Sequence, residues 1–176
     1  METFTFILST LGTVCICIPP LLKGKNMGLT LLLVFLSNTF VGMSYIFTGA
    51  FNGTVSCYVG ATQTIVNYFF QRKNRPFPWW LIATYALAFA IVNILVFTTV
   101  TDIFALLACF SFVMSICQKN GKAYRIWSLV NTSFWIVYDL FNLSFGPLGT
   151  HAILFATVIF GIIMHDIKKQ PKKAAE

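Results

Sequence analysis

Seven apolar runs, separated by short polar turns, dominate the pattern of hydrophobic and polar positions along this chain. They cover Phe4–Leu22, Gly28–Phe47, Thr54–Phe70, Trp79–Phe97, Asp102–Cys117, Lys122–Phe141 and Leu148–His165. Most of them reach the roughly 17 to 25 residues that a helix needs to cross about 30 Å of hydrocarbon. The runs are continuous, whereas the strands of a membrane barrel alternate between apolar and polar positions. The sequence therefore predicts an all-α membrane protein with seven transmembrane helices.

The weakest predicted boundary lies between the fourth and fifth runs, at residues 98–102. Its sequence contains β-branched residues and a single acid, which do not guarantee a break in a helix. Merging the two runs would give six spans and would destroy the regular distribution of charge described next. We therefore expect a break here and seven separate helices.

All 12 lysines and arginines lie in four clusters, which follow the first, third, fifth and seventh runs and, after the fifth, extend into the start of the sixth. They are Lys23 and Lys25; Arg72, Lys73 and Arg75; Lys119, Lys122 and Arg125; and Lys168, Lys169, Lys172 and Lys173. Basic residues in short loops are retained on the cytoplasmic side of a membrane. The alternation predicts an N-terminus outside, a cytoplasmic C-terminus and an odd number of spans.

The composition excludes several classes of protein. Only 10% of the residues are charged and 57% are hydrophobic, whereas a soluble domain has roughly 25% charged residues. The net charge of +7 is divided among short loops and forms no continuous basic face, so we expect anionic lipid head groups as partners and no nucleic acid. The 5 cysteines have no paired metal-ligand spacing, and no nucleotide loop or nucleophile with a base is present. We expect no enzyme activity, no cofactor and no metal. The sequence is compatible with a homo-oligomer.

The second half of the chain repeats the order of features in the first half. The spacing from Asn38 to Asn131 equals the spacing from Tyr45 to Tyr138. The sequence predicts two parallel three-helix repeats, at residues 1–75 and 102–170, joined by a linker helix at 76–101 and followed by a cytoplasmic tail at 171–176. Parallel repeats of this kind are an architecture found among transporters.

This three-plus-one-plus-three pattern resembles the SWEET/PQ-loop (MtN3-like) superfamily of transporters. Within it, the chain is most similar to the YgjV-type bacterial inner membrane proteins, which carry a W-x-x-Y/H sequence in the sixth span, here Trp135-Ile136-Val137-Tyr138. The resemblance covers nearly the whole chain and implies an integral protein of the bacterial inner membrane that moves a small polar solute by alternating access.

The chain departs from the superfamily pattern at two places. The expected Pro-Gln pairs are incomplete, with Pro19-Pro20 in the first repeat and Cys117-Gln118 in the second. The prolines remove backbone donors, so they form either an inner hinge or gate or simply the end of the first helix. Sugar carriers of this superfamily place an asparagine in the third helix of each repeat, whereas this chain offers Gln63 and Asn67 in its third span and Thr157 in its seventh. No sugar is therefore assigned as substrate.

Asp139 is the acid that lies deepest in a predicted span. At about 1.5 Å per residue it lies about 21 Å from the inner end of its helix, in the outer half of the membrane. Intramembrane carboxylates normally face the bundle interior or a wet cavity. The titratable side chain expected nearby is His151, at the outer start of the seventh span. Either the two residues, with Tyr138, line a cavity that binds solute or exchanges a proton, or Asp139 reaches outer water and His151 is an ordinary interfacial residue.

Amide and aromatic side chains form the second group of candidates. Gln63 and Asn67 share one helix face, and Asn38 and Asn131 occupy equivalent repeat positions. Amides donate and accept hydrogen bonds, which suits a neutral solute, and they also join helices to one another. Trp135 and Tyr138 lie deep enough to stack on a flat solute. The predicted function is a carrier for a neutral or weakly ionised polar solute such as a sugar or vitamin-like metabolite. The alternatives are a nucleoside or vitamin carrier similar to nicotinamide-riboside transporters, and a membrane receptor or assembly protein that does not transport.

Overall fold

The structure is a computed structural model that describes residues 2–23, 26–48, 51–73, 75, 77–95, 97, 99–143 and 145–167. The described residues form helices and contain no strand. The α-helices are α1 (Glu2–Cys17), α2 (Met27–Thr48), α3 (Phe51–Arg72), α4 (Trp79–Leu95), α5 (Asp102–Ile116), α6 (Gly121–Phe141) and α7 (Phe145–Ile162). A 3-10 turn, η1 (Pro19–Leu21), follows α1, and a π-helical segment, η2 (Ile163–Ile167), continues α7. The prediction of seven helices is confirmed.

The uncertain boundary between the fourth and fifth runs is a true break. α4 ends at Leu95 and α5 begins at Asp102, and the Val100 side chain between them is 83% exposed. The Asp102 carboxylate accepts a hydrogen bond of 2.8 Å from the backbone N–H of Thr99. Because the first N–H groups around a helix start lack helical partners, an acid here favours a new helix. Asp102 therefore helps to separate the two spans.

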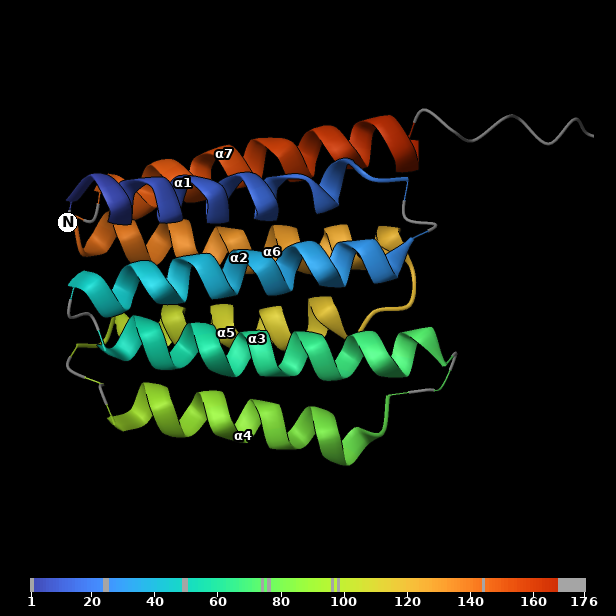
Figure 1. Ribbon diagram of the computed structural model, residues 1–176, viewed down its shortest axis with the longest axis horizontal. Helices are drawn as coiled ribbons and strands as arrows, with labels where there is room; N and C mark the ends of the chain where they lie inside the picture. Colours follow the sequence, from blue (N-terminus) through green and yellow to red (C-terminus); the bar gives the residue numbers. More distant parts are fainter. Residues whose placement is uncertain are drawn as a thin grey trace, which may run out of the picture.

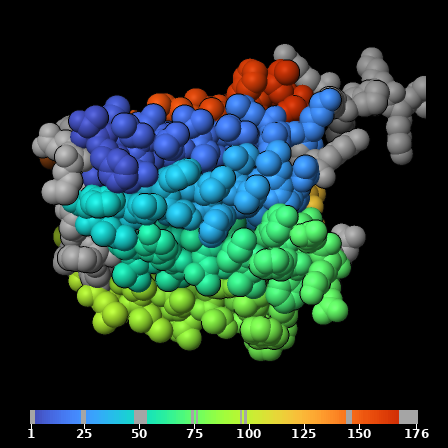
Figure 2. Space-filling view, in the orientation of Figure 1, coloured from blue at the N-terminus to red at the C-terminus, as the bar shows by residue number. Residues whose placement is uncertain are grey.

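The helices form two rows that face each other (Figure 1). In one row α2 packs between α1 and α3, and in the other α6 packs between α5 and α7. The rows meet where α1 contacts α7 and where α3 contacts α5, and α4 lies beside α3 and α5. The space-filling view shows α1 to α4 side by side across one face of the molecule (Figure 2). The parallel three-helix repeat remains a prediction, with which this helix order is compatible.

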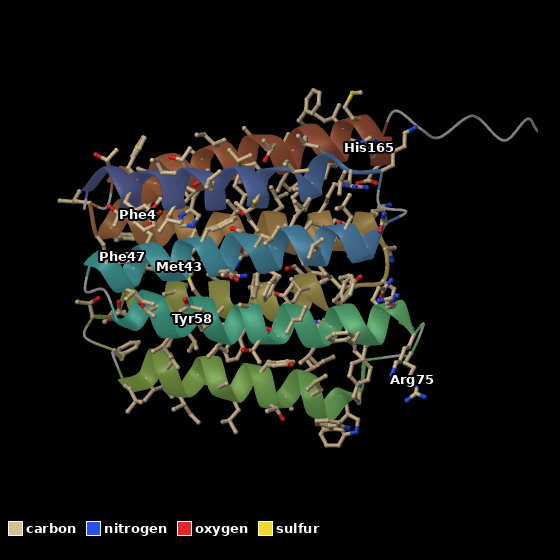
Figure 3. The ribbon with its side chains drawn as sticks, viewed as in Figure 1. Phe4, Met43, Phe47, Tyr58, Arg75 and His165 are labelled. Atoms are coloured by element: carbon tan, nitrogen blue, oxygen red, sulfur yellow. The ribbon has the colours of Figure 1, made fainter. Side chains whose placement is uncertain are left out.

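Successive helices run in opposite directions, so every described basic residue lies at one end of the bundle. These residues are Lys23, Arg72, Lys73, Arg75, Lys119, Lys122 and Arg125. Lys25, Lys168, Lys169, Lys172 and Lys173 lie outside the described residues, as does the predicted tail at 171–176. Figure 3 shows Arg75 and His165 at this end and Phe4 and Phe47 at the opposite end. We call the two ends the basic end and the opposite end.

Polar side chains lie inside the bundle and large apolar side chains cover much of its outside. Gln63, Asn67 and Thr132 are 0% exposed, whereas Trp79 is 80% exposed. This distribution is the reverse of that expected for a water-soluble domain, in which buried positions are mostly apolar. In the part of the chain that the structure describes, three helical segments are long and apolar enough to cross a membrane: Thr3–Leu21, Met27–Phe47 and Pro147–Ile167. The bundle is built to present its apolar surface to lipid.

Candidate functional site

A cavity of about 120 Å³ lies between the two rows of helices. It is lined by one amide, one hydroxyl, two thiols and three aromatic rings, from Asn38, Ser56, Cys57, Phe89, Cys109, Phe112 and Trp135. These residues come from α2, α3, α4, α5 and α6. The lining contains no charged side chain. Sequence reasoning identified Asn38 and Trp135 and missed the other lining residues, which look like ordinary packing residues until helices distant in sequence come together.

Asn38 lies near the middle of α2, and its side chain has room because the facing helix carries a glycine. The Asn38 Nδ2 donates a 3.0 Å hydrogen bond to the carbonyl of Val34 in its own helix. A Cβ atom at Gly60 would lie 3.3 Å from both Asn38 Oδ1 and Phe112 Cε1. Gly60 therefore lets α3 approach the amide closely without displacing it.

Asn131, the predicted equivalent of Asn38, does not line this cavity. Its Nδ2 donates a 2.7 Å hydrogen bond to the carbonyl of Ala108 in α5. Asn131 thus ties α6 to α5, which is the inter-helix role that amides often have in membranes. The two asparagines share a position in the proposed repeat but make different contacts.

Trp135 lies between the cavity and an acid–base pair, Asp139 and His151, which is closer to the opposite end of the bundle. Its ring stacks on the imidazole of His151, with centroids 5.5 Å apart and planes at 9°. The Nδ1 atom of His151 lies 2.6 Å from Asp139 Oδ2, and Asp139 is 2% exposed. Tyr138 meets Trp135 edge to face at 5.7 Å and its side chain also hydrogen-bonds Asp102. The structure therefore brings four of the predicted site residues into one cluster.

His151 lies further inside its helix than the sequence indicated. The prediction placed it at the outer start of the seventh span, whereas α7 already begins at Phe145. Pro147 is compatible with this start because the first turn of a helix does not require its N–H. The longer α7 carries the imidazole to the depth of Asp139, so this carboxylate is paired inside the bundle and does not simply reach outer water.

Gln63 and Asn67 form a separate polar cluster nearer the basic end. Asn67 Nδ2 donates to the carbonyl of Ile116 at 3.1 Å and lies 3.5 Å from Cys117 Sγ. Gln63 Nε2 lies 3.9 Å from the same sulfur. The Gln63 Oε1 and Asn67 Oδ1 atoms are buried without a hydrogen-bond partner. The predicted shared face is present, but it joins α3 to the end of α5 and does not line the cavity.

Thr157 also lies away from the cavity. Its hydroxyl donates a 2.8 Å hydrogen bond to the carbonyl of Leu154, and it contacts the thiol of Cys17 in α1. The first contact lies within α7, and the second joins α7 to α1. Thr157 therefore does not share a site with Asn38 or Trp135, which line the cavity.

Pro19 and Pro20 end α1 and form the buried turn η1 at the basic end. The turn is held by Arg125, a residue that the sequence suggested was an ordinary loop cation. Arg125 is buried, and its side chain binds Asp166 through Nε at 2.9 Å and Nη2 at 2.6 Å and donates through Nη1 to the carbonyl of Leu22 at 2.9 Å. We call Arg125, Asp166 and the Leu22 carbonyl the basic-end clamp. It links the first row of helices to the second.

One feature of the sequence weakly indicates the basic-end clamp. Asp166 lies next to the last basic cluster, and a lone acid beside several cations invites pairing. Nothing in the spacing identified Arg125 as its partner, because the two residues belong to different helices. The described part of the chain also holds no group of histidines, cysteines or acids placed to bind a metal ion.

Comparison with known proteins identifies a family for this chain. A family model described as a bacterial inner membrane protein, Imp-YgjV, matches residues 7–170, which is nearly the whole chain. No curated protein and no solved structure matches the sequence. The family places the chain in the bacterial inner membrane, which fits its apolar helices of membrane-spanning length. The chain therefore belongs to the Imp-YgjV family of bacterial inner membrane proteins.

Proposed function

We propose that this protein is a small-solute carrier of the SWEET-like, alternating-access type, for a neutral or weakly ionised polar solute. The observation that carries the proposal is the cavity between the two rows of helices, to which helices of both rows contribute. Sites at the interface between two structural halves are typical of carriers, because rocking one half against the other exposes such a site to each side in turn.

The lining favours an uncharged solute. Asn38 and Ser56 supply hydrogen-bonding groups, and Phe89, Phe112 and Trp135 supply apolar ring surface. A charged solute would lose its hydration here without gaining an opposite charge in the lining, which is costly. The three rings favour a solute with a flat face, so the alternative of a vitamin or nucleoside carrier has a specific structural basis.

The cavity is small for the proposed solute. About 120 Å³ is below the roughly 300 to 1,000 Å³ of pockets that hold drug-sized ligands. A sugar or nucleoside would require the two rows to move apart, and the basic-end clamp bridges the rows at one side of the cavity. Opening toward the basic end would therefore require release of Arg125 from the Leu22 carbonyl.

The acid–base pair gives the proposed solute path a group that can exchange protons. His151 stacks on Trp135, which itself lines the cavity, so the charge on His151 would alter the ring surface that meets the solute. We place the opposite end of the bundle outside and the basic end in the cytoplasm, because cationic loops are retained there. In this orientation Asp139 and His151 lie on the outer side of the cavity.

A solute screen tests the proposal through Trp135. We expect one sugar, vitamin or nucleoside in a library to raise the melting temperature of the purified protein, because a ligand that binds only the folded state stabilises it. The Trp135→Phe variant should bind this solute about tenfold more weakly, since ring stacking contributes about 1 to 3 kcal/mol. Trp127→Phe is the matched control, because Trp127 is on the same helix but does not line the cavity.

Counterflow of the same solute in proteoliposomes then separates a carrier from a receptor. A carrier should exchange labelled solute for unlabelled solute, with a rate that changes with pH if the acid–base pair takes part. Binding without counterflow would instead favour the receptor or assembly protein. Equal loss of binding in Trp135→Phe and Trp127→Phe would remove the cavity as the solute site.

A further inference from the structure

A second and larger cavity lies at the basic end, away from the proposed solute path. Its volume is about 470 Å³, and it is lined by Asn26, Met27, Gly28, Tyr68, Gln71 and Arg72. The first three residues lie at the start of α2 and the other three lie in the last turns of α3. We call it the α2–α3 pocket. It is formed within a single row of helices, so it cannot be part of a path between the rows.

The side chains that line this pocket carry several hydrogen-bond donors that no described protein group accepts, and Asn26 and Arg72 are exposed at its mouth. Among the described residues, no hydrogen bond or ion pair involves the side chains of Tyr68, Gln71 or Arg72. Asn26 uses its Oδ1 to accept from the backbone N–H of Leu29 at 3.1 Å, which leaves its NH₂ group available. The free N–H groups at the start of α2 add further donors. Arg72 can bind a planar or tetrahedral anion through two parallel hydrogen bonds.

No carboxylate neutralises this group of donors. The lining contains no acid, and the carboxylate that the structure describes at the basic end, Asp166, is already held by Arg125 at 2.6 Å. Lys23, Lys73 and Arg75 add positive charge at the same end. An anion that enters the pocket would therefore meet a guanidinium and several free donors without repulsion from a fixed negative charge.

The surface beside the pocket indicates where this anion comes from. Leu29 follows Gly28 and is 37% exposed, and Phe69 follows Tyr68 and is 54% exposed. Leu32, one turn further along α2, is also exposed. An apolar strip thus runs from the pocket along the lipid-facing side of the bundle. A water-soluble anion would use the pocket but not the strip, whereas a phospholipid would use both.

We propose that the α2–α3 pocket binds the phosphate group of an anionic phospholipid, whose acyl chains lie along Leu29, Leu32 and Phe69. Arg72 and the free donors hold the phosphate, and the apolar strip holds the chains. The site lies where α2 begins and α3 ends, so a bound lipid would fasten these two helices together at the basic end. This binding does not depend on whether the other cavity carries a solute.

The test compares lipids on the purified full-length protein in a neutral detergent. We expect phosphatidylglycerol to raise the melting temperature clearly more than phosphatidylcholine with the same acyl chains, because the second lipid carries no net charge. In Arg72→Gln the apparent affinity for phosphatidylglycerol should fall about five- to tenfold, as expected when one cation that binds phosphate directly is removed. Tyr68→Phe, which keeps the ring and removes the hydroxyl, should cause a smaller loss.

Arg75→Gln is the matched control, since it removes the same charge at the same end from an exposed residue outside the pocket. It should retain most of the phosphatidylglycerol effect. If Arg72→Gln and Arg75→Gln weakened phosphatidylglycerol binding equally, the pocket would not be the binding site, because the lipid would be attracted by surface charge in general. A full thermal shift with soluble glycerol 3-phosphate alone would overturn the assignment to a lipid. The assay involves no transported solute, so its failure and that of the carrier proposal are distinguishable.

Discussion

Replacing Arg125 with methionine should lower the free energy of unfolding by about 3 to 5 kcal/mol. The substitution keeps much of the side-chain volume but leaves the carboxylate of Asp166 and the carbonyl of Leu22 without their cation. The two side chains of the ion pair are only 3% and 9% exposed, so water cannot replace the lost contacts. Removing one partner from a buried pair leaves an uncompensated charge, which costs far more than the loss of a surface ion pair. Equilibrium denaturation in detergent micelles measures this change.

Two further variants show whether loss of the basic-end clamp causes the lower stability of Arg125→Met. Lys122→Met removes an exposed cation from the first turn of the same helix and should change stability by no more than about 0.5 kcal/mol. The double variant Arg125→Met/Asp166→Leu should recover a large part of the loss, because it removes both buried charges together. If Arg125→Met were as stable as Lys122→Met, the buried contacts of Arg125 with Asp166 and Leu22 would not stabilise the protein.

Gly161→Ala should destabilise the protein by about 3 kcal/mol, at the upper end of the range for overpacking. A Cβ atom at Gly161 would lie 2.9 Å from the Pro20 carbonyl carbon, with the attached oxygen closer still, and 3.1 Å from Arg125 Cδ. The atoms at Pro20 belong to the backbone of a buried turn, so they cannot move aside as a flexible side chain would. Relief of the clash would separate η1 from α7 and would disturb the clamp as well. Thermal unfolding monitored with the wild-type protein as reference measures the effect.

Gly149→Ala provides the control on the same helix. Apart from its chain neighbours and the backbone of its own helix, no atom of the described residues lies within 4 Å of a Cβ built at Gly149. Alanine should therefore be tolerated there, with a gain of up to about 1 kcal/mol from its higher helix propensity. A small effect at both glycines would mean that η1 does not pack closely on α7.

The helices were predictable because their signals are local. Continuous apolar runs gave the spans, and the lack of an N–H in Pro19 and Pro20 explains why α1 ends at Cys17 before a tighter turn. The break before Asp102 was weak in local sequence. It followed from the alternation of charge, which links turns that are far apart in the chain but must share one side of the membrane.

The site was less predictable because its partners are set by tertiary contacts. The sequence identified Asp139 and His151 as neighbours, since an intramembrane acid needs a partner. It could not show that Trp135 would stack on His151, or that Asn131 would bind the backbone of α5 while Asn38 lines the cavity. Arg125 shows the same limit, because its burial depends on the position of Asp166 in another helix.

The direction in which the bundle crosses the inner membrane is tested most directly by locating its two termini. Two reporters are fused in turn to each terminus: an enzyme that is active only in the periplasm and a protein that fluoresces only in the cytoplasm. Their activities in intact bacteria assign each terminus to a compartment. Seven spans with the basic end inside place the N-terminus in the periplasm and the C-terminus in the cytoplasm. Both termini on one side of the membrane would contradict the odd number of spans, and with it the carrier proposed from the arrangement of the two rows.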